Sequence, residues 1–262
     1  MQTAFRIEEL TAGYDKSIIF DNLSVRIAQG KVTTIIGPNG CGKSTLLKTI
    51  GRILKKEKGK IYLQDQDMQQ LSTKEIAKRL AILSQSPTAP FQLKVEELIS
   101  YGRYPHRKNI NRLTKKDTEM IEWAMEVTHT LEFRNRELAD LSGGQRQRVW
   151  LAMALAQETD ILLLDEPTTY LDMAHQLEVL NIVQKLNREH HCTIIMVLHD
   201  INHATRYSDE LIAMKDGAIM KCGSPSTIMT REVLKEVFNI EAKIIYDKEL
   251  DTPLCLSYDV SK

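Results

Sequence analysis

One stretch of nine residues constrains this chain more than any other feature of its sequence. Two glycines separated by four residues precede a lysine and a serine in the order Gly37-Pro38-Asn39-Gly40-Cys41-Gly42-Lys43-Ser44-Thr45. Glycines let successive backbone N–H groups close on a phosphate group, because a Cβ atom would clash or resist a positive φ. Residues 31–36 predict a buried strand before the stretch, and residues 44–54 predict a helix after it. The sequence therefore predicts a phosphate-binding loop between a strand and a helix.

Such a loop assigns roles to its last residues. Lys43 would reach the β- and γ-phosphates of a polyphosphate as a point charge, and the hydroxyl of Ser44 would be a ligand of Mg²⁺. The following helix would present the positive end of its dipole to the phosphates.

The cysteine within the loop has two interpretations. A thiol at a helix N-terminus has a lowered pKa, so Cys41 could react when the site is empty; alternatively, it is a small residue that fills a gap. The chain has four scattered cysteines without metal-like spacing, which favours a reducing compartment over a disulfide framework.

Length and charge narrow the class of protein. At 262 residues the chain suits one α/β domain, alone or with an inserted subdomain. Its 35 basic and 35 acidic residues give a formal net charge of zero. The chain therefore lacks the net positive field that attracts a nucleic-acid backbone, and we expect no nucleic acid as a partner. One basic run is either a solvated loop or a docking surface for an acidic partner or lipid headgroups; it contains Arg103, Arg107, Lys108, Arg112, Lys115 and Lys116.

The N-terminus lacks a basic-then-apolar signal, and apolar runs such as residues 194–198 are too short to span a bilayer. We therefore expect a cytoplasmic chain that is soluble by itself.

The order of the patterns predicts an α/β core with an insertion. Alternating residues over 5–27 predict antiparallel strands with turns at 13–16 and 21–22, and residues 87–140 are helical in pattern without a convincing strand. We expect a core of 1–86 and 160–262 and a helical subdomain of 87–159. The other expected elements are strands at 59–63, 80–84, 161–164 and 192–198, helices at 72–79, 145–157, 173–189 and 231–238, a hairpin at 211–222, and a final strand pair.

Two adjacent carboxylates follow the apolar strand 161–164. In an open parallel sheet this position lies beside the phosphate loop. Asp165 would pair with the Mg²⁺ that Ser44 binds, and Glu166 would be free to act as general base on a water attacking the γ-phosphate.

A second anion-binding surface is expected at residues 141–145. Ser142 precedes the glycines Gly143 and Gly144, which together with Gln145 open a helix. One chain hardly needs two surfaces for one triphosphate. The two make sense if the protein dimerises head-to-tail, so that each phosphate loop faces the other chain's serine-glycine-glycine segment.

Five segments in this order resemble the motifs of the ATP-binding cassette (ABC) ATPases along nearly the whole chain. Residues 37–45 resemble the Walker A motif and residues 141–145 the signature motif, which is close to diagnostic. Gln85 resembles the Q-loop, residues 161–166 the Walker B motif with its catalytic glutamate, and His199 the H-loop. This resemblance implies a P-loop NTPase (RecA-like) core with an N-terminal antiparallel β subdomain and an inserted α-helical subdomain.

The resemblance also implies ATP and Mg²⁺ as cofactors and a role for each matching residue. Tyr14 would stack on adenine, although its position alone equally suits a residue covering the sheet edge. Gln85 would contact Mg²⁺ and water and sense a transmembrane partner. His199 would bond the γ-phosphate and hold the attacking water with Glu166. The last two roles concern the dimer: the opposite subunit's ATP would contact Ser142 and Gly144, and Asp172 would lie in the loop crossing the interface.

Softer segments indicate a subfamily. The family often has Ser-Ala-Leu-Asp where residues 169–172 read Thr-Tyr-Leu-Asp, so we expect altered packing there with activity retained. Residues 100–106, 145–150 and 168–172 resemble ATPases of iron–siderophore, haem and cobalamin uptake, with the ferric hydroxamate uptake ATPases nearest. The resemblance implies a peripheral subunit at the cytoplasmic face of the membrane. Its partners would be a permease and, indirectly, an extracytoplasmic substrate-binding protein.

Overall fold

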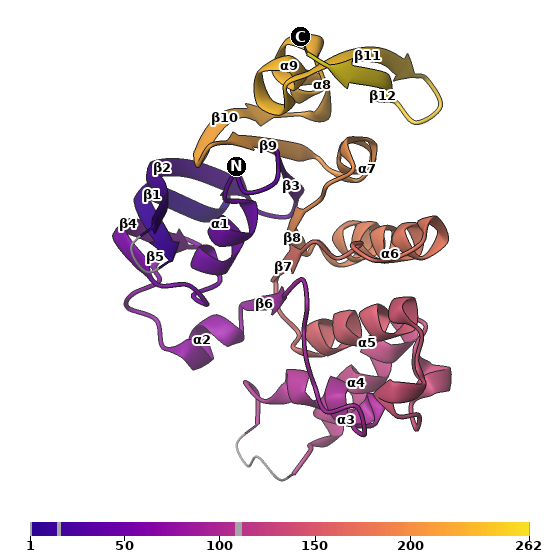
Figure 1. The fold of residues 1–262 in the computed structure, drawn as a ribbon. Helices are drawn as coiled ribbons and strands as arrows, with labels where there is room; N and C mark the ends of the chain where they lie inside the picture. The colour runs from indigo at the N-terminus through magenta and orange to yellow at the C-terminus, as the bar shows by residue number, and fades with distance from the viewer. Residues whose placement is uncertain (1, 15–16, 108–111, 262) are drawn as a thin grey trace. The chain divides into compact units, whose positions relative to one another are not determined.

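The computed structural model describes residues 2–14, 17–107 and 112–261, which form two compact units (Figure 1). The first unit joins Met1–Gln70 to Thr193–Lys262, and the second is Leu71–Cys192. The division into a core (1–86 and 160–262) and a helical subdomain (87–159) stays a prediction.

An antiparallel sheet of order β2-β1-β4-β5 forms the N-terminal part of the first unit. The strand pair expected over 5–27 is present, but the turn expected at 21–22 is wrong. Asn22 lies inside a strand with a φ of 56°, where the register with the neighbouring strand shifts, so the chain forms a bulge. The turn expected at 13–16 includes residues outside the described ones. The strands are β1 (Thr3–Tyr14), β2 (Ser17–Ala28), β4 (Lys56–Leu63) and β5 (Gln66–Asp67).

Parallel strands carry the phosphate loop of the first unit. The central strand β3 (Val32–Ile36) pairs in parallel with β8 (Thr193–Val197) and β9 (Glu210–Lys215). Every residue of β3 and β8 is buried, as expected for strands covered on both faces. The expected hairpin is confirmed: β10 (Ala218–Gly223) pairs antiparallel with β9 across Asp216 and Gly217, whose φ values are 47° and 77°.

Helix α1 (Lys43–Ile50) follows the phosphate loop and is shorter than the predicted 44–54. Arg52 adopts a left-handed φ of 57°, and the amides of Ile53 and Leu54 both donate to the carbonyl of Lys48. This capping geometry ends the helix.

The C-terminal part of the first unit contains the predicted helix and strand pair. The helix expected at 231–238 has these bounds in the structure, whereas two short helices before it were not predicted. The elements are α7 (Ile201–Tyr207), α8 (Pro225–Ile228), α9 (Arg231–Phe238), β11 (Ile240–Asp247) and β12 (Thr252–Val260), with the last two paired antiparallel.

The second unit combines a pair of parallel strands with helices. Its first helix is capped as predicted, since Ser72 accepts from the amide of Glu75 and Glu75 accepts from the amide of Ser72. Within 87–107 and 112–159, β pairing is limited to a single bridge. The elements are α2 (Thr73–Ala77), β6 (Leu80–Leu83), α3 (Val95–Ser100), α4 (Lys115–Val127), α5 (Gly143–Ala156), β7 (Ile161–Asp165) and α6 (Met173–His190), with short 3-10 turns at 101–103, 131–133 and 138–140.

A buried ionic cluster joins the helices of the second unit. The side chain of Arg103 is 1% exposed, and its guanidinium donates to the carboxylates of Asp117 (2.8 Å) and Glu158 (3.1 Å) and to the carbonyl of Ala156 (2.7 Å). Burial raises the pKa of Asp117, but hydrogen bonds from Thr114 and Arg103 outweigh it and lower that pKa to about 2. Arg103 is therefore not part of a solvated basic loop, and Lys108 of the same run lies outside the described residues.

Candidate functional site

The phosphate loop lies between β3 and α1 in the first unit, as predicted. Gly40 and Gly42 have φ values of 78° and 101°, which side chains rarely adopt. A Cβ atom added to Gly40 would meet no atom of the described residues within 4 Å, so the loop is open on that side with respect to them. Lys43 is 5% exposed, and its ammonium donates to the carbonyls of Gly37 and Pro38, each at 2.9 Å. The loop is thus an open cradle of backbone amides with a cation held at its base.

The expectation of a lowered pKa at Cys41 is wrong. Its side chain is 3% exposed, and burial raises the pKa of the thiol although Lys43 acts in the opposite direction. The structure favours the interpretation in which Cys41 fills a gap, and a Cβ atom on Gly37 would lie 2.8 Å from its Sγ.

We expect iodoacetamide at pH 7.5 to alkylate Cys41 in the folded chain at least about tenfold more slowly than in the urea-unfolded chain, because burial limits both access and the thiolate fraction. Peptide mass spectrometry over time measures this rate, with the urea-unfolded chain at the same pH as the reference. Equal alkylation rates at Cys41 in the folded and unfolded chain would contradict this account.

Two other predicted residues belong to the first unit. Tyr14 ends β1 and is 44% exposed, which leaves both interpretations of its role open. His199 is exposed and follows β8, while the next residue, Asp200, caps α7 by accepting from the amide of His203 at 2.8 Å.

In the second unit the structure brings Gln85 and Glu166 together. The amide nitrogen of Gln85, two residues after β6 ends, donates to Glu166 Oε2 at 2.5 Å. The hydroxyl of Thr169 donates to the same oxygen at 3.0 Å, a contact that the sequence analysis missed. Glu166 is 8% exposed and holds a φ of 53°, the kind of backbone strain that collects at functional sites. Its neighbour Asp165 ends β7 and is 1% exposed.

Ser142 caps α5 through a capping box. Its hydroxyl accepts from the amide of Gln145 at 3.3 Å, and the side-chain oxygen of Gln145 accepts from the amide of Ser142 at 2.9 Å. Gly143 is exposed, whereas Gly144 is buried beside the ring of His175. The helix start expected here is present two residues earlier than predicted.

Asp172 caps α6, accepting from the amide of His175 at 3.0 Å and from its ring Nδ1 at 2.8 Å. These bonds hold the pKa of the Asp172 carboxyl below its ordinary value. Just before it, Tyr170 has a φ of 66° and is 89% exposed, so most of this aromatic side chain is accessible to solvent.

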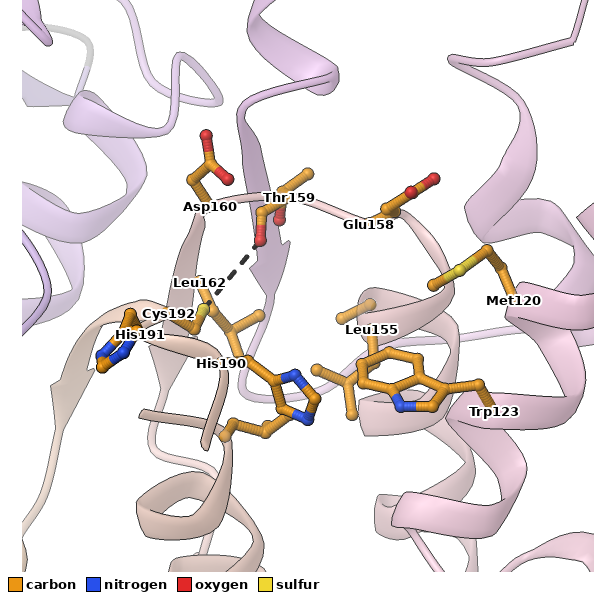
Figure 2. A pocket seen from close by; sticks show the side chains of 12 residues that line it. Met120, Trp123, Leu155, Glu158, Thr159, Asp160, Leu162, His190, His191 and Cys192 are labelled. Atoms are coloured by element: carbon orange, nitrogen blue, oxygen red, sulfur yellow. Dashed lines mark hydrogen bonds between the residues drawn. The ribbon is translucent and has the colours of Figure 1, made fainter. Parts of the chain in front are cut away.

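A separate cavity of about 320 Å³ lies in the second unit, and none of the predicted site residues lines it (Figure 2). Trp123 meets His190 edge-on at 5.4 Å between ring centroids, and Leu155 and Leu162 add apolar surface. Burial raises the pKa of Cys192 in its wall to about 12, so this thiol is inert at neutral pH.

A glycine-rich phosphate loop between a parallel strand and a helix, and an acidic pair closing another buried strand, define an ATPase of the phosphate-loop class. The family model described as ABC transporter matches residues 20–169. The chain belongs to the ABC transporter family: it binds ATP and couples ATP hydrolysis to transport. The predicted fold class is confirmed.

Comparisons with known proteins agree over nearly the full length. The chain is 52% identical to the iron(3+)-hydroxamate import ATP-binding protein FhuC of Bacillus subtilis (strain 168), covering 97% of this chain and 95% of that protein. A chain of a solved ABC transporter in an inward-facing conformation is 26% identical with a TM-score of 0.82, covering 97% and 98%. A dimeric cassette, MJ0796 bound to ADP and Pi in a post-hydrolysis state, is 28% identical with a TM-score of 0.73, covering 84% and 98%.

Among the described residues, no helix combines the length and apolar character needed to cross a membrane.

Proposed function

We propose that this chain is the ATP-hydrolysing subunit of an importer of iron–siderophore complexes, with ferric hydroxamates as the first candidate cargo. The observation that carries the proposal is the 52% identity to an iron(3+)-hydroxamate import ATP-binding protein over 97% of the chain. Haem, cobalamin and other metal chelates are the alternative cargoes of an importer, and an exporter ATPase is the more distant alternative.

The residues present fit ATP with Mg²⁺. The open glycine cradle and the buried ammonium of Lys43 suit the triphosphate, and the hydroxyl of Ser44 and the carboxylate of Asp165 each offer an oxygen of the kind that Mg²⁺ prefers. Gln85 would add a side-chain oxygen. When bound, Mg²⁺ would supply positive charge that offsets the negative charge of the phosphates. The amides of residues 37–45 would bind the phosphates, and Tyr14 would stack on adenine.

Glu166 is the proposed general base. Gln85 and Thr169 both donate to its Oε2, so they hold in one orientation the carboxylate that would take a proton from water. His199 would bond the γ-phosphate and help to place that water, and Lys43 would stabilise the charge that develops during transfer.

Two copies would close head-to-tail on two ATP molecules. In each copy Ser142, Gly143, Gly144 and Gln145 would meet the triphosphate held by the other copy's phosphate loop, and Asp172 would lie in the loop crossing the interface. The solved dimer of a related cassette supports dimerisation of this chain.

The membrane partner would be a permease bound at the cytoplasmic face, which works with an extracytoplasmic substrate-binding protein. A groove of about 360 Å³ in the second unit, lined by Gln85, Phe91, Trp150 and Tyr170 among others, is the proposed seat for a cytoplasmic helix of the permease. Contact between this permease helix and Gln85 would relay cargo binding to Glu166.

We expect a deletion strain of the source organism to lose growth on iron supplied only as a ferric hydroxamate, and to keep growth on haem or inorganic iron. The physical reason is that import stops without ATP hydrolysis. Growth on single iron sources is the measurement, and complementation with the wild-type gene and with Glu166→Gln is the matched control.

Rescue by wild type alone would support both the ATPase and the cargo assignment. Loss confined to catecholate siderophores, haem or cobalamin would replace the cargo but keep the importer. Normal growth on every hydroxamate would contradict the proposed cargo.

A further inference from the structure

One histidine outside the predicted site touches two of its segments. His175 lies in the first turn of α6, three residues after Asp172. Its ring Nδ1 is 2.8 Å from Asp172 Oδ1, and the same oxygen accepts from its backbone amide. Because the carboxylate only accepts, Nδ1 carries the proton of this bond. The ring is therefore fixed on one side by the loop that contains Asp172.

The other side of the ring lies against Gly144. A Cβ atom added to Gly144 would lie 2.6 Å from His175 Cδ2 and 2.8 Å from Cγ, closer than real Cβ contacts. The imidazole thus occupies the place that any side chain at residue 144 would need. It packs on the backbone of the first turn of α5, next to the cap formed by Ser142 and Gln145.

Further contacts in the second unit link α5, α6 and the loop between β7 and α6. Gln147 of α5 donates to the carbonyl of Pro167 at 3.0 Å, Arg148 lies 3.6 Å from the carboxylate of Glu178, and Gln176 of α6 donates to the carbonyl of Leu171 at 2.9 Å. These contacts tie α5 to the segment after β7. His175 touches both Asp172 and Gly144 of the signature segment.

We propose that His175 is a positioning residue for ATP-dependent dimerisation, holding the backbone of Gly144 at a fixed distance from Asp172 so that both reach the partner copy together. This inference rests on the head-to-tail dimer proposed above. The two segments would approach the partner as one surface only if they keep their relative placement, and the shared imidazole supplies that constraint. His175 touches neither ATP nor water in this role and acts through Gly144 and Asp172.

The test uses the full chain in the Glu166→Gln background, which should bind ATP without consuming it. Sedimentation with MgATP measures the dimer dissociation constant, and titration of dilute protein with a fluorescent ATP analogue measures nucleotide affinity of the monomer. Three substitutions divide the contacts: His175→Ala removes both, His175→Phe keeps a ring on Gly144, and His175→Asn keeps a donor for Asp172. His190→Ala on the same helix is the matched control.

We expect His175→Ala to raise the dimer dissociation constant at least about tenfold, with monomer affinity for the analogue within about twofold and an unchanged melting temperature. His175→Phe or His175→Asn should restore part of the dimerisation, and His190→Ala should behave like its parent. A purely structural role would lower the melting temperature or nucleotide affinity without such rescue.

Dimerisation of His175→Ala equal to its parent would overturn the inference, as would a loss that neither conservative variant restores. Failure of the Glu166→Gln parent to dimerise would instead overturn the proposed head-to-tail dimer, and the inference with it.

Discussion

Glu166→Gln is expected to lower ATP hydrolysis by about 10² to 10⁴-fold, the usual contribution of a general base, while ATP still binds. The amide is nearly isosteric with the carboxylate, and its oxygen can still accept from Gln85 and Thr169. The side chain should therefore keep its place and its strained backbone while losing the ability to take a proton. Phosphate release measures the rate, and a fluorescent-nucleotide titration measures binding.

Glu189→Gln makes the same chemical change at an exposed position of α6 and should leave the rate unchanged. Hydrolysis by Glu166→Gln at the wild-type rate would remove Glu166 from the role of base. A parallel loss of nucleotide affinity would mean that the substitution disturbed the site rather than its chemistry.

Arg103→Met is expected to destabilise the chain by about 3–5 kcal/mol, because it leaves a buried carboxylate without its cation. Asp117 is 4% exposed at its side chain, and this one guanidinium makes three hydrogen bonds, two of them to carboxylates, that join α4, the C-terminal end of α5 and the turn at 101–103. At roughly 2–4 °C per kcal/mol for a chain of this order of size, the melting temperature should fall by about 6–20 °C. Differential scanning calorimetry at pH 7 measures it.

The pH dependence of the stabilisation by this ionic cluster follows from the pKa of Asp117. Its pKa of about 2 in the folded chain lies below the ordinary value of 3.8, so the stabilisation from its ionised form is present above about pH 4 and is lost as the pH falls toward 2. The difference in melting temperature between wild type and Arg103→Met should therefore narrow as the pH falls from about 4 toward 2. Lys115→Met, which breaks an exposed pair with Glu119, should change the melting temperature by no more than about 1–2 °C. A similar small change in Arg103→Met would show that the cluster contributes little.

Local chemistry made several elements predictable from the sequence. The glycines of residues 37–45 allow the positive φ values that a phosphate-binding loop needs, the Asp216-Gly217 pair suits a two-residue hairpin turn, and the spacing of Ser72 and Glu75 predicts a helix cap. In each case the determining atoms lie within a few residues of one another. The residues of the candidate site are predictable for the same reason, since each motif is a short run of adjacent residues.

Contacts between distant residues were not predictable in this way. Arg103 looked like one cation in a solvated run because its carboxylate and carbonyl partners lie up to 55 residues away. The raised pKa of Cys41 is not predictable in this way, because the sequence predicts the helix whose dipole would lower the pKa but does not show the burial of the thiol that raises it. Thr169 and His175 stand near known motifs, and a polar residue three positions after an acid would have been a usable signal for both.

The cap of α5 has an electrostatic consequence. Helices α2 and α4 also begin with a capping box, but the third residue of each, Glu75 and Asp117, is an acid that neutralises the positive N-terminal end of the helix. The corresponding residue of α5 is the neutral Gln145, and its first turn contains no acid. The capping hydrogen bonds at the start of α5 are made without an acidic side chain. The partial positive charge of this helix N-terminus is therefore available to an anion from outside the chain. A glutamate here would cap the helix equally well and repel a triphosphate, which explains why an amide suits this position better than the stronger capping acid.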